Sequence, residues 1–242
     1  MDIDDAAAPD GIEIRPLDEI EQVFAASAVL DEVWGGDRTG MPPNLLRALA
    51  HSGNYAVGLY DTSGDADRMI GASVAFFAAP AARSMHSHIT GVLAEYRSLG
   101  LGRVLKQHQR AWAFARDVGH ITWTFDPLVA RNAHFNLRVL GARVDEYLVD
   151  HYGAMDDGVN RNDETDRLMV TWALAAPASP PDEARVVTSV AVPHDIEALR
   201  RADPAEALEW RYRVRDAFGG LYQDGFVVAG FDDERGYLFT RR

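Results

Sequence analysis

Residues Arg97 to Gly102 combine one arginine and two glycines at the spacing R-x-x-G-x-G, which suits them to hold a negatively charged group. A strand-like run, HITGVL, precedes the turn, and an amphipathic segment starts at Arg103. Glycines let the backbone approach an anion closely, and unpaired N–H groups at a helix start point toward it. Arg97 adds a fixed positive charge with several donors. The sequence therefore predicts a turn that can bind a pyrophosphate.

Polar side chains also follow one face of each of two predicted strands. The even-numbered positions of the first are Ser84, His86, His88, Thr90 and Val92. Those of the second are His120, Thr122, Thr124 and Asp126. Because side chains alternate across a strand, these sets indicate two polar faces and a solvated cleft. The structural alternatives are hydrogen-bonded strand histidines and an aspartate that closes a turn before Pro127.

Composition limits the classes of partner. The 242 residues include 24 Lys and Arg against 37 Asp and Glu, for a net charge of −13, which disfavours nucleic acid and anionic membranes. The absence of cysteine excludes disulfides, thiolate metal sites and a cysteine nucleophile. We expect no bound metal. The acidic start, MDIDDAAAPDG, differs from a signal peptide, and no apolar run is long enough to span a membrane, so we expect a cytoplasmic protein.

Hydrophobic periodicity and turn residues predict a mixed α/β domain. Strands are expected at residues 12–17, 55–61, 69–78, 84–93, 120–126, 144–152 and 168–174. Helices are expected at residues 19–34, 44–53, 103–118 and 130–140. Gly35-Gly36, Gly53, Gly119 and Gly141 end these helices. In the helix after the glycine turn, the apolar side is expected to hold Val104, Leu105, Ala111, Trp112 and Ala115. The element order places a parallel strand pair around that turn.

The composition divides the chain into four segments. Residues 1–11 form an acidic tail, 12–174 the main domain, 175–185 a proline-rich linker, and 186–242 a βαββ extension. In that extension we expect a strand at 186–192, a helix that begins at Pro204 and ends at Gly219-Gly220, and two strands near Phe226 and Tyr237. So short a segment buries little surface alone, so we expect it to pack on the main domain.

The stretch V-L-A-E-Y-R-S-L-G-L-G resembles the acyl-CoA pyrophosphate loop of the GNAT superfamily of N-acyltransferases, and the element order is that of its fold. The runs HSHITGV, ITWTFDPL, NAHFNLRVLGA, HYG and TDRLMVTW further resemble one subgroup of predicted GNAT enzymes. That subgroup carries a C-terminal extension with a helix similar to DPAEALEWR at Asp203–Arg211. Some members are linked to N-acylation of amino acids, including N-succinylation.

The resemblance implies a GNAT fold with splayed parallel strands and transfer of an acyl group from acetyl-CoA or another acyl-CoA to the amine of an amino acid or related small molecule. It implies cofactor contacts from Val92, Leu93, Ala94, Arg97, Ser98, Leu99, Gly100, Leu101, Gly102, Arg103, Asn132, Phe135 and Asn136. Amide formation requires a base for the attacking amine, and an imidazole titrates near neutrality. His88, His86 and Asp126 are the candidates.

One position departs from the superfamily pattern. Leu137 stands where many GNAT enzymes carry the tyrosine that protonates the departing sulfur. Either the thiolate leaves unaided, or Tyr147, Tyr152 or His134 substitutes for that tyrosine. Arg167 is a candidate clamp for a substrate carboxylate, with pairing to Asp166 or Glu164 as the structural alternative.

Two other interpretations stay open. A non-catalytic CoA-binding or assembly module would explain the missing tyrosine. A nucleotide phosphate loop is disfavoured because G-K-[ST] is lacking. Exposed strand edges also make a homodimer plausible.

Overall fold

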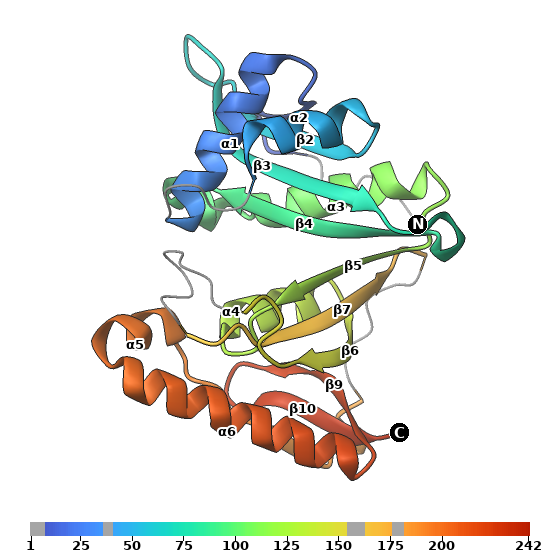
Figure 1. The fold of residues 1–242 in the computed structure, drawn as a ribbon, viewed down its shortest axis with the longest axis vertical. Coiled ribbons are helices and arrows are strands. Elements are labelled where there is room, and N and C mark those ends of the chain that lie inside the picture. Colours follow the sequence, from blue (N-terminus) through green and yellow to red (C-terminus); the bar gives the residue numbers. More distant parts are fainter. Residues whose placement is uncertain (1–7, 36–40, 154–162, 176–181) are drawn as a thin grey trace. The chain divides into compact units, whose positions relative to one another are not determined.

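The computed structural model in Figure 1 describes residues 8–35, 41–153, 163–175 and 182–242. Residues 1–7 of the expected acidic tail, Gly36, and residues 176–181 of the expected linker lie outside the described residues. The chain forms two compact units, Met1–Ile121 and Thr122–Arg242. The division between them falls within the main domain that the sequence suggested over residues 12–174.

The observed elements follow the expected order over that domain and confirm a mixed α/β fold. The strands are β1 (Ile12–Pro16), β2 (Tyr55–Asp61), β3 (Arg68–Phe77), β4 (Ser84–Val92), β5 (His120–Phe125), β6 (Arg143–Leu148) and β7 (Arg167–Ala173). They form a seven-stranded sheet in the order β1-β2-β3-β4-β5-β7-β6. The α-helices are α1 (Ile20–Trp34), α2 (Pro43–His51), α3 (Leu101–Phe114) and the short α4 (Ala130–Ala133).

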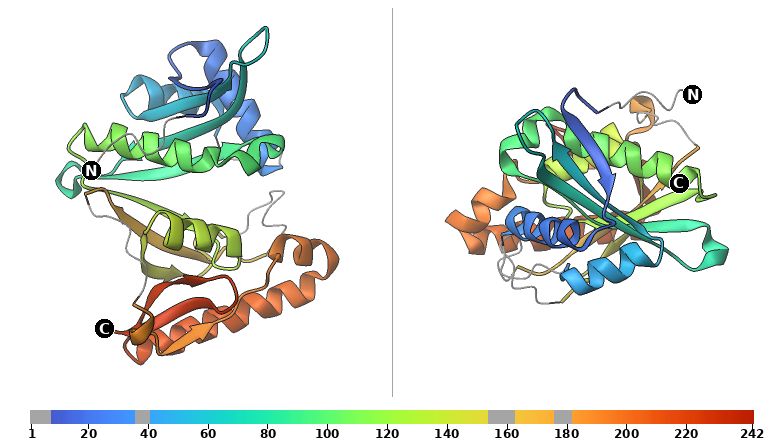
Figure 2. Two further views of the ribbon diagram at one scale, coloured as in Figure 1. Left: turned by 180° about the vertical axis from the view of Figure 1, so that it is seen from behind. Right: turned by 90° about the horizontal axis from the view of Figure 1, so that it is seen from above.

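In the first unit, helices cover both faces of the antiparallel strands β1 to β4. Gly91 of β4 faces α1, since a Cβ there would lie 2.9 Å from Cγ1 of Val33. The next residue back, Thr90, points to the opposite face, where Ser73 of β3 contacts Gln109 of α3. Accordingly, α1 lies on the near side of the strands in Figure 1 and α3 on the near side in the left view of Figure 2.

A β-bulge interrupts β4 and changes which side chains share a face. Val74 pairs with Ile89 and the adjacent Ala75 pairs with Ser87, which leaves His88 as an extra residue. The even-numbered polar face expected for residues 84–92 is therefore wrong for this strand. Ser87 and Thr90 lie on the α3 face with Ser73, because the bulge shifts the alternation by one residue.

Helix α3 is shorter than the segment expected over residues 103–118 and buries a different face. Its buried side chains are Leu101, Leu105, Lys106, Gln109 and Ala113. Of the expected apolar side, only Leu105 is fully buried, whereas Trp112 is partly exposed. The difference arises because two polar residues, Lys106 and Gln109, occupy positions against the sheet.

The second unit contains β5, β7 and β6, followed in the chain by the C-terminal extension. Strands β6 and β7 pair antiparallel. After α4 the helix widens to a π-helical segment, His134–Val139, which ends at Gly141 with φ of 70°. π-helical turns are uncommon and often occur at functional positions.

The extension differs from the expected βαββ pattern. It comprises β8 (Thr188–Val190), α5 (Ile196–Ala202), α6 (Pro204–Gln223), β9 (Phe226–Asp232) and β10 (Gly236–Arg241). The strands form a separate sheet in the order β8-β10-β9. Two helices replace the single expected one because Asp195 and Asp203 each cap a helix start, at 2.8 and 3.0 Å. Helix α6 continues through Gly219-Gly220, and the chain turns at Gly225 with φ of 80°.

Aromatic contacts hold the extension against the rest of the second unit. The ring of Phe218 in α6 lies 5.2 Å from that of Tyr147 in β6. The buried hydroxyl of Tyr237 in β10 donates to the carbonyl oxygen of Pro127 at 2.8 Å. The extension therefore shares one hydrophobic core with residues that follow β5 and with β6.

Candidate functional site

The turn after β4 leaves its backbone open to a ligand. Leu93 is buried, residues Ala94–Leu99 form a 3₁₀ segment, and Gly100 adopts a left-handed φ of 71° before α3 begins. A Cβ at Gly100 or Gly102 would meet no atom within 4 Å. Packing therefore does not require glycine at position 102, where it weakens a helix. A ligand that approaches this backbone closely would explain the glycine at position 102.

The charges around this turn suit a diphosphate. At the start of α3, the N–H of Arg103 donates to the carbonyl oxygen of Gly100 at 2.9 Å, whereas the N–H groups of Leu101 and Gly102 precede the first acceptor of the helix. Arg97 is exposed and forms no ion pair with other described residues, whereas Glu95 pairs with Arg68 at 2.9 Å. The residues present therefore fit the pyrophosphate of CoA. Leu99 and Arg103 lie in the same stretch, while the side chain of Ser98 lies outside what the structure describes.

The histidines of β4 lie beside one aromatic ring. The ring of Phe76 in β3 is 5.3 Å from that of His86 and 5.9 Å from that of His88. His88 is the bulge residue, and its side chain is exposed. Desolvation by neighbouring atoms lowers the pKa of His88 below its usual 6.5, so the imidazole is neutral over a wider pH range. The exposure of His88, against the partly buried His86, favours His88 as a base.

Asp126 is buried in a cluster of arginines rather than exposed in a cleft. Both of its oxygens accept from Arg211, at 2.8 and 3.0 Å, and Oδ2 also accepts from Arg200 at 2.6 Å. Its Oδ1 closes the turn before Leu128 at 2.9 Å. Burial alone would raise the pKa of Asp126, but the two arginines outweigh it and hold that pKa well below the usual range. An aspartate so engaged is a poor proton acceptor, which argues against the base role considered for it.

Arg167, the first residue of β7, lies close to this cluster and is buried. Its Nη1 donates to the backbone oxygen of Asp166 at 2.9 Å, and its guanidinium lies 5.4 Å from the ring of Tyr152. The side chain of Asp166 instead pairs with Arg215, at 2.6 and 2.9 Å. Burial lowers the pKa of Arg167, but the group stays a cation at neutral pH.

Tyr152 connects Arg167 with the polar face of β5. Its hydroxyl is 2.8 Å from Oγ1 of Thr124, and its side chain is exposed. Tyr147 and His134, the other two residues considered as a substitute acid, each contact an aspartate. The hydroxyl of Tyr147 donates to Asp166 at 2.6 Å, and burial raises its pKa strongly. His134 is 2.8 Å from Asp233.

The segment expected to meet the cofactor is the helix at 130–140. Asn136 is buried, while Asn132 and Phe135 are partly exposed. Leu137 is also buried, and it lines a cavity of about 140 Å³ with Val144 of β6 and residues of β9. The extension thus covers Leu137, and this position serves the core of the second unit.

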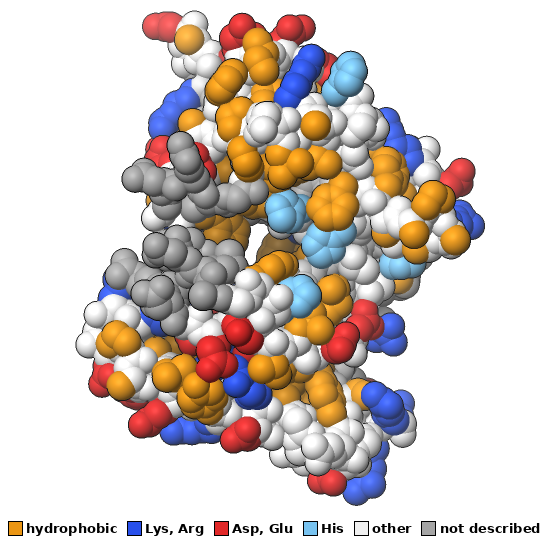
Figure 3. Space-filling view, in the orientation of Figure 1, with side chains coloured by type: hydrophobic (Ala, Val, Ile, Leu, Met, Phe, Trp, Pro, Cys, Tyr) orange, Lys and Arg blue, Asp and Glu red, His pale blue; other side chains and the backbone are white. Residues whose placement is uncertain are grey.

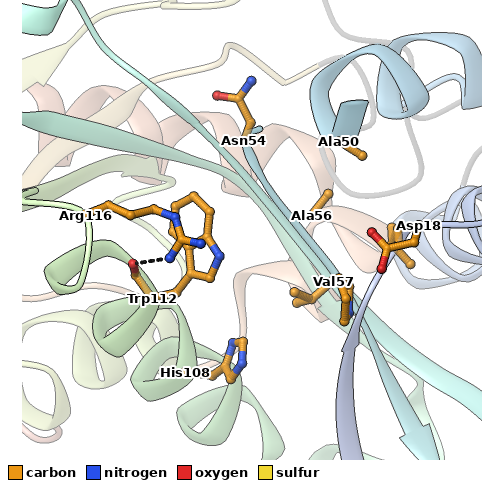
Figure 4. A pocket seen from close by; sticks show the side chains of 10 residues that line it. Asp18, Ala50, Asn54, Ala56, Val57, His108, Trp112 and Arg116 are labelled. Carbon is orange, nitrogen blue, oxygen red and sulfur yellow. Dashed lines mark hydrogen bonds between the residues drawn. The ribbon is translucent and has the colours of Figure 1, made fainter. Parts of the chain in front are cut away.

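A larger cavity, about 300 Å³, lies in the first unit and contains none of the predicted site residues. Figure 4 shows His108 and Trp112 of α3, with Arg116 just beyond it, facing Asp18 and the start of β2. Arg116 stacks on Trp112, with its guanidinium 3.8 Å from the ring centroid. The hydroxyl of Tyr55 is 2.9 Å from Nδ1 of His108. Arg116 and His108 therefore have structural partners within this unit.

The described side chains bear on other ligand classes. On the face drawn in Figure 3, basic side chains are scattered among acidic ones, and histidines lie beside hydrophobic side chains. Among the described residues, no group of three His, Asp or Glu could hold a metal ion. No helix in this described part is long and apolar enough to cross a membrane.

Sequence reasoning missed two groups of buried polar residues. Lys106 and Gln109 lie within helical spacing of buried Leu105 and Ala113, and that spacing was the available signal. Arg211 is fully buried in α6 between the buried Ala207 and Val214, again at helical spacing. Charged side chains at such positions are ordinarily assigned to the solvent face, which is why both were missed.

Comparisons with known proteins give matches by structure but none by sequence. No family model matches the sequence, and no curated protein matches it. Solved structures do match. The ribosomal-protein-S18-alanine N-acetyltransferase from Escherichia coli has a TM-score of 0.53 at 14% identity, covering 69% of this chain and 96% of its own. The fold is that of the GNAT acetyltransferases.

Two further GNAT structures agree with this assignment. The ribosomal-protein-S5-alanine acetyltransferase from Vibrio fischeri has a TM-score of 0.54 at 15% identity, over 72% of this chain and 98% of its own. The PaiA N-acetyltransferase from Thermoplasma acidophilum, in complex with coenzyme A, has a TM-score of 0.51 at 14% identity, over 67% and 98%. About a third of this chain thus lies outside each GNAT match.

Proposed function

We propose that this chain is an acyl-CoA-dependent N-acyltransferase that transfers a short acyl group to a primary amine. The observation that carries the proposal is the turn at Arg97–Gly102, where two glycines with open space beside them lie at the N-terminus of α3. The GNAT fold supports it, since the PaiA structure of that fold contains coenzyme A. The bound acyl-CoA would supply the activated thioester.

In this proposal, each residue of the first unit has a distinct task. The N–H groups at the start of α3 and the guanidinium of Arg97 hold the diphosphate. His88, neutral at physiological pH, accepts the proton that the attacking amine loses. The backbone of Val92, Leu93 and Ala94, which leads into the turn, lies along the pantetheine arm.

We assign acceptor recognition and the acid to Arg167 and Tyr152. Arg167 is a cation beside an exposed tyrosine, which suits a carboxylate of an amino-acid acceptor or of a succinyl donor. Tyr152 is the acid that protonates the departing thiolate, because its hydroxyl is accessible and lies 2.8 Å from the hydroxyl of the neutral Thr124. Asn132, Phe135 and Asn136 are proposed cofactor contacts.

A non-catalytic CoA-binding module is the second candidate, and Leu137 favours it. That side chain is buried in the core of the second unit, so it supplies no acid at this position. The two candidates differ in one measurement. A transferase releases free thiol from an acyl-CoA only when an acceptor amine is present, whereas a binding module retains CoA without release.

The first experiment is therefore an acceptor screen. Acetyl-CoA and succinyl-CoA are incubated with free amino acids, small amines and a peptide with an N-terminal alanine. Thiol release and the mass of the product are recorded. A product with an amino acid supports the proposed acceptor class, and a product only with the peptide replaces it. Tight CoA binding with no product from any acceptor supports the binding module.

The glycine turn has its own test. Replacing Gly102 with valine places a side chain where the ligand backbone contact is proposed, and we expect CoA affinity to fall by about 100-fold. Isothermal titration with CoA measures the effect. Gly219→Val is the matched control, because Gly219 also lies in a helix with no atom within 4 Å of its Cβ position. Equal CoA binding by Gly102→Val and the wild type would contradict a ligand at this turn.

A further inference from the structure

A chain of buried polar side chains connects α3 to both sides of the bulge in β4. Nζ of Lys106 is 2.7 Å from Oγ of Ser87 and 3.3 Å from Oε1 of Gln109. Nε2 of Gln109 is 3.5 Å from Oγ of Ser73, which is 2.8 Å from Oγ1 of Thr90. Ser87 precedes the bulge residue and Thr90 follows it by two positions. The helix therefore holds the strand on either side of His88.

Burying the polar side chains of Lys106 and Gln109 costs free energy of folding. Lys106 is 7% exposed and Gln109 is fully buried. Burial lowers the pKa of Lys106 from 10.5 to about 7, which shows how strongly the interior disfavours the ammonium. An apolar side chain of similar length would fill the same space without that cost. Packing alone therefore does not account for a lysine here, whereas the directed hydrogen bond to Ser87 does.

The position of Lys106 links the bulge to the glycine turn. Helix α3 begins at Leu101, and Lys106 follows five residues later, about 7.5 Å along the helix axis. A helix is stiff over this length, so a displacement of its N-terminus moves Lys106 and Gln109 with it. A β-bulge, by contrast, lacks part of the regular strand pairing and depends on its surroundings for a fixed conformation.

We propose that Lys106 is a positioning residue that, through Ser87 and with Gln109, fixes the bulge carrying His88 relative to the diphosphate-binding turn. Binding of the CoA diphosphate at the N-terminus of α3 is thereby coupled to the placement of His88. This inference rests on the proposed function, because it assumes that His88 is the base and that CoA binds at the turn. The bulge itself can be examined without a substrate.

The first test uses amide hydrogen exchange in the free protein. Lys106→Met removes the ammonium but keeps an unbranched side chain, and Ser87→Ala removes the acceptor. We expect each to speed exchange at the His88 and Ile89 amides about 10-fold relative to the rest of β4, with the double variant no faster than the faster single one. Leu105→Ala is the matched control, since it removes buried apolar contact from the same helix. Equal acceleration by Leu105→Ala, or none by Lys106→Met and Ser87→Ala, would overturn the positioning role.

The second test adds CoA and follows binding and turnover. In the wild type, CoA shifts the His88 and Ile89 amide resonances. In Lys106→Met, we expect CoA to bind within about 3-fold of the wild-type affinity while these shifts are lost, and kcat to fall at least about 10-fold at nearly unchanged KM for acyl-CoA. Unchanged shifts and kcat in this variant would refute the coupling. Failure of the wild type to bind CoA would instead refute the proposed function, and the exchange experiment would still decide whether Lys106 fixes the bulge.

Discussion

At the scale of single residues, the same side-chain type takes different roles in different surroundings. His88 and Asp126 were both candidate bases, but His88 is exposed on a bulge and Asp126 is enclosed by two arginines. A general base must be available without its proton and within reach of a substrate. Of these two residues His88 is the exposed one, which is why we propose it as the base. The ion pairs with Arg200 and Arg211 keep Asp126 ionised and give it a structural role.

The role of His88 predicts a pH dependence. A base acts when it is neutral, and desolvation lowers the pKa of His88 below 6.5. We therefore expect the acidic limb of the kcat/KM profile to fall below pH 6.5, and His88→Gln to lower kcat about 100-fold or more and to remove that limb. The profile is measured with acyl-CoA and the acceptor found in the screen. His51→Gln, on the exposed end of α2, is the control. A profile that His88→Gln leaves unchanged would assign the base elsewhere.

Lys106 predicts a stability that depends on pH. Its pKa is about 7 in the folded protein and 10.5 when exposed, so between these values the unfolded chain holds a proton that the folded chain lacks. The free energy of unfolding therefore rises with pH over this window, by up to about 1 kcal/mol per pH unit. Urea denaturation at pH 7 and pH 9 should show a smaller rise for Lys106→Met than for the wild type. Parallel changes in both proteins would mean that Lys106 keeps its ordinary pKa.

At the scale of elements, three arginines fasten the extension helices to the rest of the second unit. Arg200 of α5 and Arg211 of α6 both contact Asp126 and Asp163, and Arg215 of α6 contacts Asp166. Burial would lower the pKa of Arg211, but these aspartates raise it well above its usual value. The loop after β5, the segment before β7 and two helices of the extension therefore meet in one ion cluster.

The cluster predicts a large effect for Arg211→Met. The substitution leaves Asp126 and Asp163 buried with one arginine fewer, and breaking a buried pair costs about 3–5 kcal/mol. We expect a loss of that size in the free energy of unfolding at pH 7, measured by urea denaturation. Arg213→Met is the control on the same helix, because Arg213 is exposed and its guanidinium stacks on Trp210, 4.5 Å from the ring centroid. A loss below about 1 kcal/mol for Arg211→Met would show that the cluster contributes little to the stability of the second unit.

At the scale of the whole molecule, the extension is part of a folded unit rather than an appendage. It supplies Arg211 to Asp126, Phe218 to Tyr147 and Tyr237 to Pro127. The compact unit Thr122–Arg242 contains both the extension and the last strands of the GNAT fold. Folding of β5, β6 and β7 should therefore depend on residues of the extension.

Truncation tests this dependence. A chain that ends at residue 185 leaves Asp126 and Asp163 without Arg200 and Arg211, and it exposes the ring of Tyr147. We expect residues 122–153 and 163–175 of this chain to lose protection from proteolysis and from amide hydrogen exchange. The full chain with Arg213→Met serves as the folded reference. A truncated protein with protected β6 and β7 would show that the extension is dispensable for folding.

The sequence alone determined the element order over residues 12–174, the glycine turn and most strand limits, because hydrophobic periodicity, glycine and proline act locally along the chain. It did not determine which polar side chains share a face. The bulge at His88 separates Thr90 from the histidines, and it is set by pairing between β3 and β4. Nor could local pattern show that Lys106, Arg211 and Asp126 are buried. A buried charge is tolerated only where distant residues supply its partners, and only the tertiary structure brings those partners together.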